Sequence, residues 1–323
     1  MKNVAFALLT LTALCTHSGT AIAGYPDQPI RIIVPFAPGG IADTTARVIG
    51  EDIAQQLGQP VIVDNRPGGA TIIGTGAVAH AKPDGYTLLM GSTNVSTNAA
   101  LYNKLPYDTD RDLTPVALSM TLPGALVVNP SLPINNYAEL IAYARAHPGK
   151  LNYASVGQGS FPHLALEKLM QATTVKMTHV PYKGYAPAIM AVLSGEADLL
   201  ASDLPGAMAY LKSGKLRAIA LTGAKRAAVL PEVATIQESG APQYEAVGWL
   251  GIMAPAGTPS SVISTLNEAI NKTMRKPHIA ARFTVQGAEV VTESPADFRK
   301  FLDKNRKGWE QVIKAANISL ESP

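Results

Sequence analysis

Short apolar runs rich in β-branched residues alternate along the chain with longer segments of helical periodicity. We expect strands at the apolar runs, which are Ile30–Val34, Val61–Val63, Thr87–Met90, Leu126–Val128, Lys176–Val180 and Leu216–Leu221. We expect helices at the periodic segments, which are Ala42–Leu57, Phe161–Ala172, Pro187–Ser194 and Pro259–Arg275, with a C-terminal helix at Pro295–Ala316. Strands that alternate with helices form parallel sheets covered on both faces. The pattern therefore predicts an α/β fold.

Two segments have the composition of passages between lobes. They are Leu122–Ala125 and Tyr244–Ile252, and the second runs into a stretch rich in proline and glycine. If the chain crosses twice, lobe 1 is built from residues 24–123 plus 248–323, and lobe 2 from residues 124–247. Two crossing strands make a natural hinge. The full chain is 47% hydrophobic, and the roughly 300 residues expected in the mature protein are enough for two cores.

The N-terminus has the three-part layout of a secretory signal peptide. Lys2 precedes an apolar run from Val4 to Cys15, and Ala21 and Ala23 provide the small residues before a cut. The run is shorter than the ~20 residues that span a bilayer. We therefore expect residues 1–23 to be cleaved after Ala23 and the mature protein to reach the periplasm. The cut removes the only cysteine, so the mature chain has no disulfide and no thiol nucleophile.

Charge and histidine placement argue against several classes of function. The net charge is +3, and the basic residues are dispersed, which does not favour nucleic-acid binding. The histidines are scattered without ligand spacing, so we expect no metal, and no further apolar stretch indicates stable membrane insertion. Gly74–Ala79 fits a dinucleotide pattern but follows the turn Arg66–Gly69 rather than a strand. Helix packing explains it better, and we expect no cofactor.

The first candidate ligand loop is Val34–Asp43, where a predicted strand ends and a helix begins. Gly39 and Gly40 let the backbone turn tightly and direct N–H groups at a small anion, assisted by the helix N-terminus. An ordinary loop in which Asp43 caps the helix fits the spacing equally well. A phosphate loop is disfavoured because no Gly-Lys-Ser/Thr follows the glycines.

The second candidate loop is Asn152–His163. Ser155 and Ser160 supply hydroxyl donors beside exposed amides, which suits a carboxylate held without a formal positive charge. Alternatively, Ser160 caps the helix and His163 packs on its first turn. A hydrolase built on Ser160 and His163 is disfavoured, because the G-x-S-x-G elbow is missing and two residues three apart on one helical turn do not make a triad.

The third candidate loop is His179–Pro187, in which Tyr182 and Tyr185 offer rings and hydroxyls to a ligand. Both could also be surface aromatics. Ser92 likewise follows the predicted strand Thr87–Met90, and Asp203 follows the apolar segment Ala197–Ala201, which we expect to be a strand of lobe 2. All these loops lie at the carboxyl ends of parallel strands, which is the edge where open α/β sheets bind ligands. Two such edges that face each other across a hinge would form a cleft.

At these residues the sequence resembles the Bug family, the TctC-like extracytoplasmic solute receptors of tripartite tricarboxylate transporters. The matching strings are Tyr25–Pro26, Ile30–Asp43, Val63–Gly69, Pro83–Leu88, Tyr153–His163, His179–Gly184, Lys212–Thr222, Leu230–Val233 and Trp249–Pro259. The resemblance implies a type II periplasmic-binding-protein fold, with two lobes, mainly parallel sheets and a two-crossing hinge. It also implies Venus-flytrap closure, with a carboxylate held directly by lobe 2 and partly through water by the loop at Pro38–Asp43.

The resemblance also implies a set of ligand-binding residues. Carried over by position, they are Phe36, Pro38, Gly39, Gly40, Asp43, Ser92, Ser155, Gly157, Gly159, Ser160, His163 and Asp203. Two departures from the family pattern, Ile41 and Tyr185, would narrow the cleft and make it more apolar, and we add Tyr185 to the candidates. They lead us to hypothesise a ligand acid with an aromatic or longer carbon body, a dicarboxylic acid included.

The sequence thus predicts a non-enzymatic periplasmic receptor that captures a small organic carboxylate and delivers it to membrane transporter subunits. We expect the receptor to be a monomer. The open alternatives are a ligand-sensing subunit for a membrane signalling partner and, less in keeping with the motifs, a periplasmic hydrolase.

Overall fold

The computed structural model describes residues 24–321, so the predicted signal peptide lies outside the described residues. The strands are β1 (Ile30–Val34), β2 (Val61–Asn65), β3 (Thr87–Ser92), β4 (Leu113–Val128), β5 (Asn152–Ser155), β6 (Thr178–Pro181), β7 (Leu199–Asp203), β8 (Arg217–Leu221), β9 (Val247–Pro255) and β10 (Glu289–Val290). The helices are α1 (Ile41–Leu57), α2 (Ile72–Ala79), α3 (Thr93–Leu101), α4 (Thr109–Asp112), α5 (Tyr137–Ala146), α6 (Phe161–Thr173), α7 (Tyr185–Ser194), α8 (Leu204–Lys212), α9 (Ser260–Met274), α10 (Pro277–Thr284) and α11 (Pro295–Ala315), with a short 3₁₀ turn, η1, at Gly69–Thr71.

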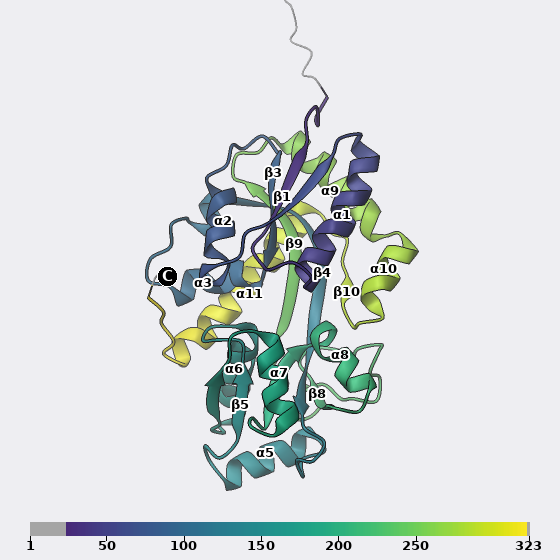
Figure 1. Cartoon of the computed structure of the whole chain (residues 1–323). Helices are drawn as coiled ribbons and strands as arrows, with labels where there is room; N and C mark the ends of the chain where they lie inside the picture. The colour runs from purple at the N-terminus through teal and green to yellow at the C-terminus, as the bar shows by residue number, and fades with distance from the viewer. Residues whose placement is uncertain (1–23, 322–323) are drawn as a thin grey trace, which may run out of the picture.

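Two long strands, β4 and β9, connect the two lobes of the molecule (Figure 1). The first part of β4 pairs antiparallel with β9 as far as the Pro123–Val247 pair. From Gly124 onward β4 pairs instead with β7 and β8. Lobe 1 therefore contains β1, β2, β3 and β10, and lobe 2 contains β5 to β8. The segment Leu122–Ala125 lies within β4, and the segment Tyr244–Ile252 overlaps the start of β9.

Parallel pairing at the outer part of each lobe turns the strand ends toward a common space. In lobe 1 the order is β2-β1-β3, with β1 parallel to both neighbours. In lobe 2 the corresponding order is β7-β5-β6, again with parallel pairs. Residues that follow β1, β3, β5 and β7 all line one cleft between the lobes. The α/β class and the two-lobed periplasmic-binding fold expected from the sequence are confirmed.

Each lobe has its own apolar core, built mostly from strand residues and the inward faces of the helices. Ile32 and Leu88 are fully buried in lobe 1, as are Tyr153 and Leu164 in lobe 2. The dinucleotide-like glycines lie in helix α2, where a Cβ on Gly74 would come within 2.8 Å of the Pro35 Cβ. Close packing of the helix, rather than nucleotide binding, therefore accounts for that pattern.

Helix α11 packs into the cores of both lobes. Its first half places Phe298 against Trp249 of lobe 1, with ring centroids 5.5 Å apart. Its second half places Trp309 in the lobe 2 core, edge-on to Phe161 at 6.1 Å. The C-terminal helix predicted at Pro295–Ala316 is present as α11, and it forms a third physical link between the lobes beside the two crossing strands.

Candidate functional site

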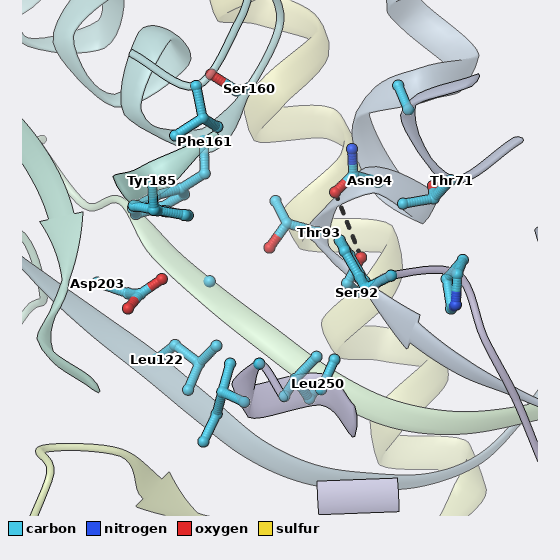
Figure 2. Close-up of a pocket in the computed structure, with 18 of the residues that line it drawn as sticks. Thr71, Ser92, Thr93, Asn94, Leu122, Ser160, Phe161, Tyr185, Asp203 and Leu250 are labelled. Atoms are coloured by element: carbon cyan, nitrogen blue, oxygen red, sulfur yellow. Dashed lines mark hydrogen bonds between the residues drawn. The ribbon is translucent and has the colours of Figure 1, made fainter. Parts of the chain in front are cut away.

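A cleft of about 780 Å³ lies between the lobes and is lined by both of them and by the crossing strands (Figure 2). Its lining is mostly apolar, with Phe36, Leu122, Phe161 and Leu250 among the larger side chains. Among residues 24–321, Asp203 is the one lining residue of a charged type, and the lining drawn from this range includes no lysine, arginine or histidine. Any attraction for an anion must therefore come from uncharged groups.

Eight of the thirteen residues expected at the site line this cleft. These eight are Phe36, Gly39, Gly40, Ser92, Gly159, Ser160, Tyr185 and Asp203. The other five, Pro38, Asp43, Ser155, Gly157 and His163, are outside the lining. Pro38 is exposed on the surface of its loop, whereas the other four support the backbone that faces the cleft.

Five helices begin at the cleft wall. The first or second residue of each lines the cleft, and these are Ile41 of α1, Thr93 of α3, Phe161 of α6, Tyr185 of α7 and Pro205 of α8. First-turn N–H groups have no acceptor within their own helix, and the helix dipole places partial positive charge there. No side chain caps these N-termini in α1 and α7, whose N-cap residues are glycines, and the N-cap serines of α3 and α6 make no capping hydrogen bond. The cleft wall is thus rich in backbone donors suited to an anion.

Asp43 holds the first loop in shape from behind the cleft. Its carboxylate accepts a hydrogen bond from the Gly39 N–H at 2.9 Å, forms an ion pair with Arg47 at 2.9 Å and accepts from Asn65 at 3.0 Å. Burial alone would raise the pKa of this carboxyl. The bonds from Arg47, Gly39 and Asn65 outweigh burial and lower the pKa, so Asp43 is a charged anchor for the loop.

Several polar groups of the second loop are paired by hydrogen bonds within the loop itself. The Gly157 N–H donates to the Ser155 hydroxyl at 3.1 Å, and the Ser160 hydroxyl donates to the Gly157 carbonyl at 2.6 Å. The Gly159 N–H donates to Nδ1 of His163 at 2.9 Å. The N–H groups of Gly157 and Gly159 are therefore committed within the loop, whereas the first turn of α6 presents N–H groups that have no acceptor in their own helix.

Aromatic and polar side chains support this loop from the lobe 2 interior. His179 lies 2.6 Å from the Ser155 hydroxyl, and Tyr153 donates to Glu167 at 2.8 Å. Burial, and then the neighbouring His163, lower the pKa of His179 to about 4. Burial would raise the pKa of Glu167, but hydrogen bonds from His163 and Tyr153 outweigh it and lower that pKa.

Ser160 and His163 do not form a nucleophile and base pair. The Ser160 hydroxyl is bonded to the Gly157 carbonyl, and Nδ1 of His163 accepts the Gly159 N–H. Nε2 of His163 faces Glu167 at 3.6 Å. Each side chain is thus committed to the shape of the loop, and the hydrolase alternative receives no support from this geometry.

The lobe 1 wall includes residues that the sequence did not identify. Figure 2 shows Thr71 on the same side of the pocket as Ser92 and Asn94, opposite Tyr185 and Asp203. Asn98 donates to the Ala70 carbonyl at 3.0 Å and so holds the turn before α2. Ala70 and Thr71 adopt positive φ values of 49° and 79°. Neither residue is a glycine, so their identity gives no sign of this conformation in the sequence. Only the preceding glycine pair was a usable signal.

On the lobe 2 wall, Tyr185 and Asp203 lie next to each other (Figure 2). The Asp203 carboxylate caps helix α8 by accepting the Gly206 N–H at 2.7 Å. Burial raises the pKa of Asp203, against the opposing bonds from Gly206 and Tyr185. Burial and the adjacent Asp203 raise the pKa of Tyr185. Tyr182, by contrast, is outside the cleft lining and donates to Glu196 at 2.8 Å.

Residues 24–321 contain no group of three or more histidine, cysteine or acidic side chains placed to hold a metal ion. None of the helices in the same range is long and apolar enough to cross a membrane.

Comparison with known proteins gives matches over nearly the whole chain. The model of the family described as "Tripartite tricarboxylate transporter family receptor" matches residues 45–318. Protein BugT of Bordetella pertussis is 36% identical over 299 residues, covering 92% of this chain and 92% of BugT. A protein from the tcbD-tcbE intergenic region of Pseudomonas sp. (strain P51) is 36% identical over 93% of this chain and 90% of its own.

Solved structures agree with these matches. Rpa4515 of R. palustris with adipate superposes with a TM-score of 0.83 at 35% identity, covering 92% of this chain and all of that one. MatC of Rhodopseudomonas palustris with bound malate gives 0.79 at 33% identity, over 90% of this chain and 100% of MatC. The periplasmic binding protein BugD gives 0.80 at 33% identity, over 92% and 100%.

Proposed function

The chain belongs to the Bug, or TctC-like, family of periplasmic receptors for tripartite tricarboxylate transporters, and on that premise we propose that it captures a small organic carboxylate in the cleft between its lobes. The lobes, with the boundaries 24–123 plus 248–323 and 124–247, close around the ligand. The closed protein, a periplasmic monomer freed of residues 1–23, then delivers the acid to membrane transporter subunits. Two relatives whose structures contain adipate and malate support an acid as the ligand.

The observation that carries the proposal is the convergence of helix N-termini on a cleft without a basic side chain. A carboxylate needs hydrogen-bond donors, and the backbone amides at the start of α6 provide them on lobe 2. Helices α1 and α3 present their first turns from lobe 1. A neutral ligand would make weaker bonds to the same donors, because hydrogen bonds to an ionised acceptor are roughly twice as strong.

Closure follows from contacts that a ligand can make only with both lobes together. Gly159 of lobe 2 lies against Leu101 of lobe 1, so the lobes already meet beside the cleft. A ligand that touches both walls binds the closed arrangement better and shifts the hinge equilibrium toward it. Micromolar binding requires about −8 kcal/mol. A few charge-assisted bonds of about 1.5–3 kcal/mol each, with burial of the carbon body, are of that order.

Calorimetric titration of the mature protein tests the proposal. The panel pairs acids with their neutral amides, for example benzoate with benzamide and adipate with adipamide. We expect at least one acid to bind about tenfold or more tightly than its amide. Absence of binding by every acid, or equal binding by the amides, would overturn the proposal.

A pair of variants isolates the backbone donor at the start of α6. Phe161→Pro removes both the ring and the N–H, whereas Phe161→Ala removes only the ring. Phe161 is the first residue of the helix, where proline is well tolerated, so both variants should fold. We expect the proline variant to bind the acid about tenfold more weakly than the alanine variant. Equal affinities would place the carboxylate elsewhere.

A further inference from the structure

Asp203 is unusual in this cleft because it is an acidic side chain on the lobe 2 wall, where the backbone N–H groups favour an anion. It is the one charged lining residue, and it faces the same space as the α6 N-terminus. A ligand carboxylate placed beside it would be repelled. The lobe 2 wall therefore has two polar regions with opposite preferences. The α6 N-terminus attracts an anion, and Asp203 repels one.

The Asp203 carboxylate keeps acceptor capacity that the protein does not use. Oδ1 accepts the Gly206 N–H at 2.7 Å, and the side chain also interacts with the Tyr185 hydroxyl. An ionised carboxylate has about four lone-pair sites, so two partners leave room for a donor from a ligand. Figure 2 shows the carboxylate directed from the lobe 2 wall into the cleft, below Tyr185.

The apolar surroundings make an additional partner valuable. Leu122 lies near Asp203 on the crossing strand β4, as Figure 2 shows. A carboxylate in such surroundings is poorly solvated, and burial accordingly raises its pKa. A hydroxyl or ammonium group of a ligand would offset that cost by donating to the free acceptor sites, and a hydrocarbon group at the same place would not.

We propose that Tyr185 and Asp203 form a donor-recognising subsite, so that the preferred ligand is an acid whose carbon body carries a hydroxyl or amino group. This inference rests on the proposed function, since it concerns the far end of the same ligand. Asp203 accepts the ligand's donor. Tyr185 orients the Asp203 carboxylate and closes the space around the carbon body.

The test compares acids that differ only in the donor. Benzoate is compared with 3- and 4-hydroxybenzoate, and hexanoate with 6-hydroxyhexanoate and 6-aminohexanoate, by calorimetry on the mature protein. We expect at least one donor-bearing acid to bind about tenfold more tightly than its parent. Equal affinities within every pair would overturn the inference and leave the carboxylate receptor standing. Failure of every acid to bind would overturn the proposed function as well.

Two variants of Asp203 keep the fold while changing the acceptor. Asp203→Asn and Asp203→Ser both retain a good helix N-cap for α8. Serine is too short to reach the ligand, and asparagine lacks the charge. We expect the preference for the donor-bearing acid to fall to about twofold or less in both, with the affinity for the parent acid equal or higher. A preference that persists in both variants would refute the assignment.

The chain offers a matched control on the same lobe. Tyr182 and Glu196 form a second tyrosine–carboxylate pair outside the cleft lining. Glu196→Gln changes the net charge by the same amount as Asp203→Asn. We expect it to leave the preference within about twofold of the unmodified protein, because its charge is exposed and screened. Loss of the preference in this control would assign the effect to net charge rather than to the subsite.

Discussion

The imidazole rings of His163 and His179 stack face to face in lobe 2, with their centroids 4.0 Å apart and 10° between their planes. His163 accepts the Gly159 N–H, and His179 lies within hydrogen-bonding distance of Ser155. The stacked pair therefore supports both ends of the loop from Ser155 to Ser160, and changes in either ring should be transmitted to the cleft.

Acid should destabilise the protein through His179. Burial, followed by the neighbouring His163, lowers the pKa of His179 from 6.5 to about 4. The unfolded chain takes up a proton near its ordinary pKa, while the folded chain stays neutral until about pH 4. This contribution to stability is therefore complete above the unfolded pKa and is lost as the pH falls toward the folded one. Because the ring is only partly buried, we expect a loss of about 1 kcal/mol between about pH 7 and about pH 5.

Urea unfolding as a function of pH measures that loss. His179→Gln keeps an amide near the position of Nε2 and has no titrating group. The unfolding free energy of the unmodified protein should fall more steeply over this pH range than that of the variant. Parallel pH profiles for the two proteins would show that His179 is not the responsible group.

His163 should act through its acceptor nitrogen. His163→Asn places an amide oxygen close to the position of Nδ1, so the Gly159 N–H keeps a partner. His163→Ala leaves that buried N–H unpaired, at a cost of about 1–3 kcal/mol in the unfolding free energy. We expect ligand affinity to follow the same order, with the asparagine variant close to the unmodified protein. Thermal melts and calorimetry check both quantities, and equal losses in the two variants would contradict the role.

Gly159 should control how closely the lobes approach. A Cβ on Gly159 would lie 2.7 Å from Cδ1 of Leu101 on the other lobe, whereas a Cβ on Gly157 would meet nothing within 4 Å. Both glycines have positive φ, at 75° and 122°, so alanine strains the backbone in either place. Gly159→Ala should therefore weaken ligand binding about tenfold more than Gly157→Ala and expand the protein in solution. X-ray scattering with ligand reports the expansion, and equal radii of gyration would count against the contact.

Thr222 should stabilise the hinge by linking the crossing strand β4 to the residue that precedes the crossing strand β9. Its hydroxyl accepts the Gly124 N–H at 3.0 Å and donates to the Ala246 carbonyl at 2.7 Å, and the side chain is fully buried. Thr222→Val leaves both backbone groups without this partner and should lower the unfolding free energy by about 1–3 kcal/mol. Thr222→Ser keeps the hydroxyl and should recover most of the loss. Chemical denaturation of both variants gives the comparison, and a serine variant as unstable as the valine variant would refute it.

Much of the fold could be predicted because the apolar positions that repeat along the sequence are the positions that are buried in the strands and helices. The predicted strand Ile30–Val34 has the bounds of β1, and the helix Ala42–Leu57 begins one residue inside α1. The predicted strand Lys176–Val180 begins too early, because β6 starts at Thr178, opposite the first residue of β5. The length of β4 was missed because Pro115 interrupts its pattern. The sheet accommodates that proline with a shift in register against β9.

The site could be predicted only as far as single loops reveal it. Gly39 and Gly40 indicated a backbone turn between a strand and a helix, and both residues line the cleft. The sequence could not show that Ser155 turns inward to His179, since that depends on the pairing of β5 with β6. Trp249 and Gln286 line the cleft from segments distant in sequence, with no local motif to mark them. Side-chain orientation and distant contacts are products of tertiary packing, which spacing along one chain does not encode.

The helix starts around the cleft have a consequence for how this architecture can diversify. Their attraction for a negative ligand arises from peptide groups, which every non-proline residue supplies alike. Replacing a side chain on the wall, such as Tyr185 or Ile41, can thus reshape the space without abolishing the preference for acids. One scaffold can in this way be refitted to many different acids by ordinary point mutation.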